Sequence, residues 1–202
     1  MIFKDITTET TSTYTLKKNE ECVFFMLNKN GDLTFELAGE NSKAYIFALY
    51  LDDTSTREIQ ITQQHNAHHT ISQTITRSVL SGDAILNYKG LIHIALSGNH
   101  SSANQESRAL LLSGTARHSA IPSLEILPRD VICHHKASAS PLNQESLYYL
   151  QSRGLNKKES SRMLINGFLE TTFEQIADLG VAHTKLQKIR EIVLEKLLTL
   201  YA

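Results

Sequence analysis

The most reactive side chains of this sequence lie in the segment VICHHKAS, where Cys133, His134 and His135 are consecutive. In a β-strand Cys133 and His135 share one face, and His134 points to the opposite face. A thiolate beside an imidazole is a plausible ligand pair for iron, copper or zinc, and a protonated imidazole would lower the pKa of the thiol. The alternative, which the residues alone favour, is a small buried cysteine beside a hydrogen-bonded histidine. Two ligands are too few for a closed metal site, so completing one needs another chain or a distant part of the fold.

A second histidine cluster, His65, His68 and His69, lies in the segment QQHNAHHT. Histidines that bind a metal usually have a carboxylate or thiolate nearby, and this segment contains neither. The simplest interpretation is a polar loop whose imidazoles are solvated or bonded to the backbone.

Known catalytic motifs are absent from the sequence. It contains no phosphate-binding GxxxxGK[ST] loop, no GxGxxG, no GxSxG and no HExxH, and the two adjacent carboxylates, Asp52 and Asp53, would point to opposite faces of a strand. The only cysteines, Cys22 and Cys133, form no CxxC pair. The sequence therefore predicts a protein that is not an enzyme and that lacks both a disulfide framework and a cysteine-rich zinc module.

Charge and hydropathy exclude two kinds of partner. Twenty basic and 21 acidic residues give a net charge of -1, too balanced for general binding to phosphate backbones. No apolar run reaches the roughly 20 residues of a membrane span, and the first residues do not resemble a signal peptide. We therefore expect a cytoplasmic protein that binds neither nucleic acid nor membrane.

The elements that must position these residues change type near Pro141. Residues 1–141 consist of short apolar runs separated by turn residues, typical of an all-β region. The tripeptide Leu-Ser-Gly recurs at residues 80–82, 96–98 and 112–114, a fixed spacing of sixteen. This spacing favours a β-solenoid in which a glycine corner recurs once per coil, and a β-sandwich stays open as the alternative.

Residues 142–202 have helical periodicity. Asn143 can cap a first helix that stops at Gly154, and Asn156 with Glu159 forms a capping-box pattern for a second. Gly180 is expected to end a third short helix. A last helix from Thr184 has an apolar face, which we expect to pack on its own neighbours.

Six segments of the chain, between about residues 50 and 170, resemble the SufB/SufD family of scaffold proteins of the SUF iron-sulfur cluster assembly system. The segments are HTISQT (69–74), YKGLIHIA (88–95), NQESRALLLSGTA (104–116), PSLEILPRDVICHHKAS (122–138), LNQESLYYLQSRGL (142–155) and MLINGF (163–168). The resemblance implies a right-handed parallel β-helix over residues 1–141, followed by a C-terminal α-helical region over residues 142–202. It therefore favours the solenoid over the sandwich.

The resemblance also implies residue roles. A Cys-x-His-Gly-Ala motif of SufD-like members, near the interface between two scaffold subunits, aligns with residues 133–137, so His135 matches the histidine implicated in cluster assembly. SufB-like members resemble Glu-His-Glu-Ala here, which makes this chain more like SufD. Lys136 replaces the usual glycine and adds a charge beside that histidine. The helices that include the turn Ser152, Arg153 and Gly154 bind the ATPase subunit SufC in relatives.

The resulting prediction is a non-catalytic scaffold subunit of iron-sulfur cluster assembly. Its expected partners are a SufC-type ABC ATPase and either a SufB-like subunit or a second copy of itself, which gives a dimer. No stably bound cofactor is expected, although an iron-sulfur cluster can form transiently at a subunit interface. Relatives are longer, so we expect a short form that lacks their N-terminal region. The alternatives are a metal-dependent enzyme on an all-β fold and an interaction module without cluster chemistry.

Overall fold

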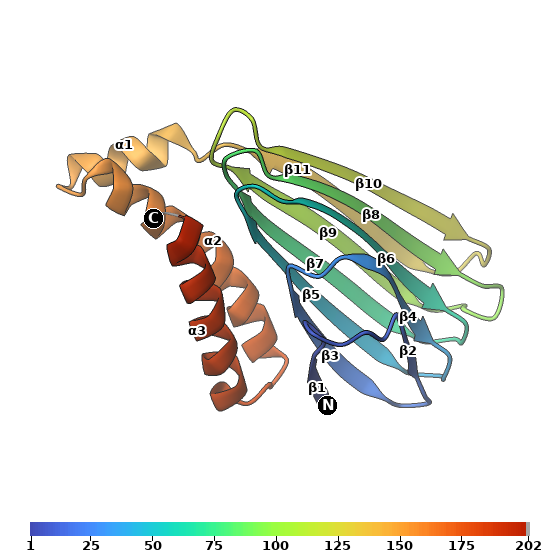
Figure 1. The fold of residues 1–202 in the computed structure, drawn as a ribbon. Helices are drawn as coiled ribbons and strands as arrows, with labels where there is room; N and C mark the ends of the chain where they lie inside the picture. Colours follow the sequence, from blue (N-terminus) through green and yellow to red (C-terminus); the bar gives the residue numbers. More distant parts are fainter. Residues whose placement is uncertain (201–202) are drawn as a thin grey trace.

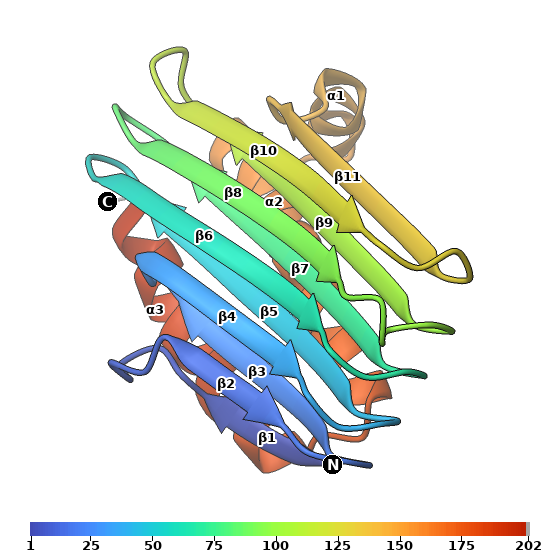
Figure 2. The same cartoon turned by 90° about the vertical axis from the view of Figure 1, so that its right-hand side faces the viewer.

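Eleven parallel strands form a two-layer β-solenoid in the computed structural model, which describes residues 1–200 (Figure 1). The strands are β1 (Ile2–Asp5), β2 (Thr13–Leu16), β3 (Glu21–Leu27), β4 (Gly31–Leu37), β5 (Lys43–Asp52), β6 (Thr56–His65), β7 (Ile71–Leu80), β8 (Ile85–Ile94), β9 (Ser102–Leu111), β10 (Arg117–Ile126) and β11 (Ile132–Ser140). The odd-numbered strands make one sheet, called the odd sheet, and the even-numbered strands make the other, called the even sheet (Figure 2). The predicted β-helix is confirmed, and the sandwich is excluded.

The core between the two sheets follows from alternation along each strand. In β4, Leu33, Phe35 and Leu37 are buried while the residues between them are partly exposed. Near the N-terminal end of the solenoid Phe35 stacks on Tyr14 with 5.3 Å between ring centroids, and Phe24 completes the cluster at 4.8 Å from Phe35. Period-2 apolar spacing therefore places one face of each strand inside.

The central strands of the odd sheet are buried on both faces. In β5, Ile46 and Tyr50 point into the core between the sheets, while Phe47 and Leu51 pack under the helices. This double burial explains the near-continuous apolar run in β5, which strict alternation would not produce. The even sheet has no helix over its outer face in the part of the chain described, and its strands alternate clearly (Figure 2).

Three helices follow the strands: α1 (Gln144–Ser152), α2 (Lys157–Asp178) and α3 (His183–Leu200). Asn143 caps α1, and Asn156 with Glu159 forms the predicted capping box of α2. The prediction of a separate third helix ending at Gly180 is wrong, because α2 continues through Gly167. The buried residues on either side, Ile165 and Leu169, keep that face of α2 on the core, so one exposed glycine does not end it.

A largely buried ion pair lies on the face of the odd sheet that α2 covers. The Arg77 side chain on β7 contacts the Glu106 carboxylate on β9 at 2.7 Å between Nη2 and Oε1. The Arg77 guanidinium also lies 5.7 Å from the centroid of the Phe168 ring on α2. These contacts join the helical region to the sheet.

The Leu-Ser-Gly repeat marks half a coil, not one coil. Residues 80–82 and 112–114 stack at the same corner, where Leu112 N donates to Leu80 O at 2.8 Å and Ser113 Oγ donates to Gly82 O at 2.6 Å. Residues 96–98 lie at the opposite corner, where Ala95 N donates to His65 O. Of the three glycines, only Gly82 has a positive φ, at +47°. The expectation of one glycine corner per coil is therefore wrong, because sixteen residues make one strand and one turn.

The tightest backbone approach is at Gly39, where a Cβ atom would lie 1.9 Å from the backbone nitrogen of Lys18 on the preceding coil. We expect Gly39→Ala to lower the free energy of unfolding by about 3 kcal/mol, because backbone must move to accommodate the methyl group. Gly114→Ala is the matched control, since a Cβ there meets nothing within 4 Å, and should change stability by less than about 0.5 kcal/mol. Urea unfolding of both variants is the measurement, and equal effects would contradict the packing described.

Candidate functional site

Cys133 and His135 lie on β11, the last strand of the odd sheet. In the parallel register with β9, Cys133 is the partner of Ala103 and His135 is the partner of Gln105, both of which are buried between the sheets. Cys133 and His135 therefore share the inner face, while His134 and Lys136 share the outer face. The expectation that Lys136 adds a charge beside His135 is corrected by this alternation, because Lys136 points away and aligns with Glu106.

Cys133 is half-buried and packs with Val131 against Ile92, Ile94 and Ala103. Burial raises the pKa of the Cys133 thiol, and a backbone hydrogen bond at Ala103 opposes this only in part. A lowering of this pKa by a neighbouring imidazole is not among the causes of the shift, so burial decides its direction and the thiol is protonated at neutral pH. Among residues 1–200, no three His, Cys, Asp or Glu side chains surround a metal position.

The last coil exposes the apolar interior of the solenoid. Leu124 and Ile126 on β10 face inward and are each 38% exposed, whereas their register partners Ile92 and Ile94 on β8 are fully buried. The difference arises because no further coil of the described chain covers β10 and β11. This open end therefore presents apolar side chains, two unpaired strand edges and the Cys133–His135 pair together.

A row of polar side chains inside the solenoid was missed by sequence reasoning. Gln63 Nε2 donates to Ser72 Oγ at 2.6 Å, and Gln105 Nε2 donates to Gln63 Oε1 at 3.3 Å. Gly90 makes room for this row, because a Cβ there would lie 2.3 Å from the Gln105 side chain. The signal was present in β6, where Gln63 continues the inward alternation of Ile59 and Ile61.

His65 belongs to this interior row and not to a polar loop. It is fully buried, and its two ring nitrogens lie 2.7 Å from Thr70 Oγ1 and 2.7 Å from Ser72 Oγ. Burial lowers the pKa of His65 to about 4 and that of His118 on β10 to about 4. The expectation of a solvated loop is wrong for His65, and it holds for His68 and His69, which lie exposed on the following turn.

Ser152, Arg153 and Gly154 form the end of α1. Ser152 Oγ donates to Tyr149 O at 2.7 Å, the Arg153 guanidinium lies 5.2 Å from the Tyr149 ring centroid, and Gly154 has φ +97°. A groove of about 420 Å³ separates α1 from α2. Its lining residues are Glu145, Ser146, Tyr149, Leu150, Met163 and Leu164.

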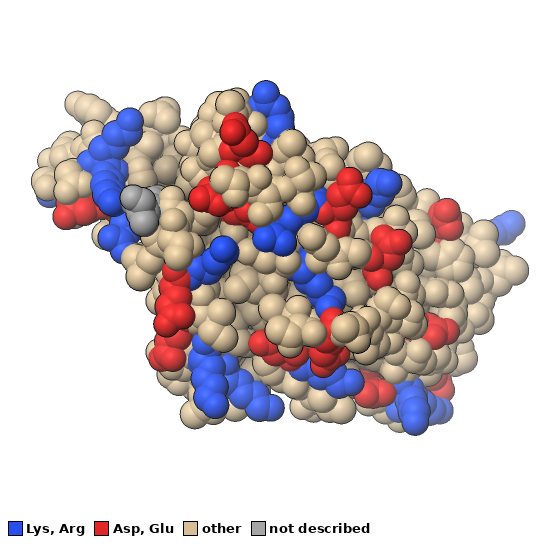
Figure 3. Space-filling model, viewed as in Figure 1, with Lys and Arg blue, Asp and Glu red and all other residues tan. Residues whose placement is uncertain are grey.

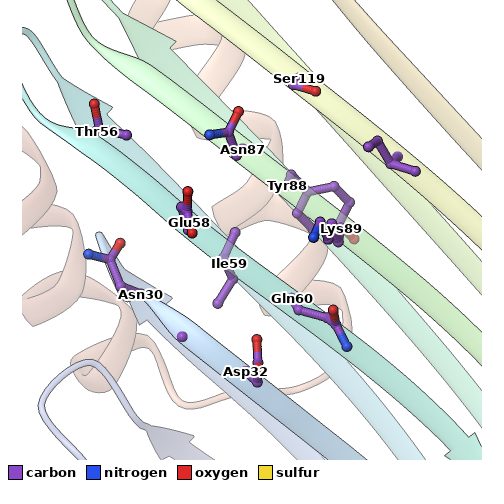
Figure 4. Close-up of a pocket in the computed structure, with 12 residues that line it drawn as sticks. Asn30, Asp32, Thr56, Glu58, Ile59, Gln60, Asn87, Tyr88, Lys89 and Ser119 are labelled. Atoms are coloured by element: carbon purple, nitrogen blue, oxygen red, sulfur yellow. The ribbon is translucent and has the colours of Figure 1, made fainter.

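A hollow of about 540 Å³ lies on the outer face of the even sheet and contains none of the predicted site residues (Figure 4). It is lined mostly by polar side chains, among them Asp32, Glu58 and Lys89. Acidic and basic residues are interspersed over the face shown in Figure 3, in keeping with the balanced composition. No helix within residues 1–200 is long and apolar enough to cross a membrane.

The fold and the site define a parallel β-solenoid protein with a thiol and an imidazole at an open end and a helical region on one sheet. A family model described as "SUF system FeS cluster assembly, SufBD core domain" matches residues 23–168. The chain belongs to this SufBD family. The resemblance inferred from the six segments is thus confirmed, while the closer likeness to SufD stays a prediction.

Individual relatives agree with the family match. The iron-sulfur cluster assembly SufBD family protein ycf24 of Galdieria sulphuraria is 26% identical over 146 residues, covering 69% of this chain and 64% of that protein. The SufBD family protein Mb1496 of Mycobacterium bovis is 26% identical over 141 residues, covering 69% of this chain and 17% of that protein. The iron-sulfur cluster assembly protein SufB of Bacillus subtilis is 29% identical over 106 residues, covering 52% of this chain and 23% of that protein. The chain thus spans less than two thirds of each of these relatives.

The lowered pKa values of His65 and His118 predict a pH dependence of stability. The pKa values of His65 and His118, about 4 in the folded chain, lie below the value of about 6.5 in an unfolded chain, so the unfolded state binds more protons between these limits. Stability should be complete above about pH 6.5 and fall as the pH decreases toward 4, by on the order of 3 kcal/mol for His65 alone. Urea unfolding between pH 7 and pH 5 measures it. His118→Asn should remove roughly half of the slope, and an unchanged slope would contradict the lowered pKa of His118.

Proposed function

We propose that this chain is a non-catalytic scaffold subunit of cytoplasmic iron-sulfur cluster assembly. In this proposal the open end pairs with a second β-helix subunit, either SufB-like or identical, and the helical region binds a SufC-type ATPase. An iron-sulfur cluster forms transiently at the joint between the two subunits and is not a resident cofactor. Family membership supports the assembly role, and the geometry of the open end carries the assignment of the joint.

The open end supports pairing because its groups are costly to leave in water. The edges of β10 and β11 have backbone donors and acceptors with no partner strand, and Leu124 and Ile126 lie exposed beside them. A second solenoid end would form hydrogen bonds with the unpaired backbone groups along these edges and would also cover the exposed apolar side chains. The same pairing would enclose Cys133 and His135 and supply the ligands that two residues cannot.

A thiol of raised pKa is compatible with this role. In the isolated chain the Cys133 thiol is protonated, because burial against Ile92 and Ile94 disfavours the thiolate. Binding of a metal ion deprotonates a coordinating thiol. The free subunit would thus keep its cysteine unreactive until iron and a partner are both present.

The groove between α1 and α2 is the proposed ATPase contact. Tyr148 is 76% exposed and Tyr149 is 57% exposed, and Met163 adds an exposed apolar side chain from α2. Exposed aromatic side chains beside an apolar groove are typical of protein interfaces. Ser152, Arg153 and Gly154 end α1 beside this groove, where Ser152 donates to the Tyr149 carbonyl and the Arg153 guanidinium lies over the Tyr149 ring.

The two alternatives have less support. A metal-dependent enzyme on this fold would need a site with more ligands than any that residues 1–200 form. An interaction module without cluster chemistry would retain the same open end and groove, and differs from the scaffold only in the role of His135. The following variants separate it from the main proposal.

We expect His135→Ala to abolish rescue of a strain that lacks its SufBD scaffold, with little change in melting temperature, because His135 is exposed at the open end. His134→Ala is the matched control, since this neighbouring exposed side chain points to the other face, and it should rescue normally. Complementation and thermal melts on the same variants are the measurements. Normal rescue by both variants would favour the interaction module, and rescue that follows melting temperature alone would make His135 structural.

We expect Met163→Glu to reduce co-purification of a SufC-type ATPase at least about tenfold, because a buried unpaired charge in an interface is strongly unfavourable. Thr171→Glu, at an exposed position of α2 outside the groove, should leave recovery unchanged. Thermal melts confirm that both variants fold. Full recovery with Met163→Glu would place the ATPase contact elsewhere.

A further inference from the structure

One corner of the solenoid stacks four left-handed residues that are not glycine. In the turns that lead from even to odd strands, Asn19, Asn41, His69 and His100 have φ values of 59°, 59°, 57° and 60°. Backbone hydrogen bonds link each turn to the next, including His69 N to Asn99 O at 3.1 Å and His100 N to Asp130 O at 2.6 Å. Asparagine and histidine are among the few side chains that adopt this conformation readily. The repeated conformation places the same side-chain position of each coil above the last.

The two histidines of this corner form a stacked pair. The rings of His69 and His100 are 4.9 Å apart between centroids and within 15° of parallel. At the two preceding coils Asn41 and Asn19 make the equivalent contact, with 3.3 Å between Asn41 Nδ2 and Asn19 Oδ1. The corner is therefore a ladder of side chains in which asparagine is replaced by histidine over the last two positions.

Asp130 determines which nitrogen of His100 carries the proton. His100 Nδ1 lies 2.7 Å from Asp130 Oδ2. An ionised carboxylate can only accept, so Nδ1 carries the hydrogen and Nε2 keeps its lone pair. A carboxylate that accepts from one ring nitrogen while the other binds a metal is the arrangement commonly found behind metal-ligating histidines. At the neighbouring position, His68 Nε2 lies 3.3 Å from Glu40 Oε1, which adds a second carboxylate near the pair.

We propose that His69 and His100 form a two-imidazole binding site for a divalent first-row transition metal ion, with Asp130 as the residue that positions His100. An ion bound at about 2.1 Å to both rings needs the two nitrogens within roughly 4.2 Å of each other. The rings are stacked 4.9 Å apart and nearly parallel, so their nitrogen lone pairs, which lie in the ring planes, do not converge in this arrangement. Both side chains are exposed, so the His69 ring can turn toward an ion on His100 Nε2 while His100 keeps its contact with Asp130. Water fills the remaining positions of the ion, because residues 1–200 provide no group of three ligands.

A site with two protein ligands exchanges its ion readily, which suits cargo better than a structural metal. Imidazole is a ligand for Fe²⁺ and also for the later metals of the series. Asp130 lies in the turn that leads directly into β11 and Cys133. The corner is thus an entry point where Fe²⁺ is held before it reaches the open end. This choice of iron as the cargo rests on the proposed function, whereas metal binding by the two imidazoles does not.

The test is a Co²⁺ titration of the full tag-free chain, labelled with ¹⁵N and followed by NMR. Paramagnetic broadening should centre on the amides around His69 and His100. His69→Asn and His100→Asn should each weaken Co²⁺ binding at least about tenfold, and Asp130→Asn by about tenfold. Asparagine is the chosen replacement because Asn19 and Asn41 already occupy this position with the same φ. His183→Ala, which removes an exposed imidazole at the start of α3, should bind Co²⁺ like the unmodified chain.

Two results would overturn the inference. One is Co²⁺ binding unchanged in both asparagine variants, and the other is broadening centred on Cys133 and His135. A repeat with Fe²⁺ under anaerobic conditions tests the cargo, and no competition between Fe²⁺ and Co²⁺ would remove iron from the proposal. Failure of the His135 rescue experiment with intact Co²⁺ binding would contradict the proposed function alone, so the two failures are distinguishable.

Discussion

Every strand of this solenoid lies in parallel register with a strand one coil away, and that register is the constraint on which the rest of the structure depends. The register gives the backbone N–H and C=O groups of each inner strand hydrogen-bond partners on both sides. It also aligns the side chains of successive coils, as with Leu86 on β8 and its register partner His118 on β10. At the last coil, no further strand within residues 1–200 pairs with the outer edges of β10 and β11. The exposed Leu124 and Ile126, the edge of β11 and the inward-facing Cys133 and His135 are consequences of the same interruption.

Within residues 1–200, helices cover the outer face of the odd sheet and not that of the even sheet. The proposed ATPase contact on the helices and the proposed subunit contact at the open end therefore lie in different places. Helices α2 and α3 bury the outer face of the odd sheet, where the Arg77–Glu106 pair meets Phe168 (Figure 1). Strand β11 begins beside Cys133 and His135 and ends where the chain enters α1. One strand therefore runs along the open end and leads into α1, which lines the groove on the other side of the chain's turn.

The fold gives its histidines three different environments. His65 is buried and His118 is partly buried, and both lie within hydrogen-bonding distance of hydroxyl groups, which makes them part of the interior packing. His69 and His100 are stacked at an exposed corner beside carboxylates, and His135 is exposed at the open end. Because all five are histidines, burial and neighbouring charge decide which of them can accept a proton or a metal ion.

Local patterns in the sequence determined much of this protein. Alternation in β4 predicts its buried face, Asn143 and Asn156 predict two helix starts, and the spacing of Cys133 and His135 predicts a shared face. These features depend on residues a few positions apart. The tertiary structure alone decided that sixteen residues make half a coil, that α2 continues through Gly167, and that His69 stacks on His100, 31 positions away. Which residues meet between coils depends on the length of every intervening turn and strand, and no local pattern encodes that sum.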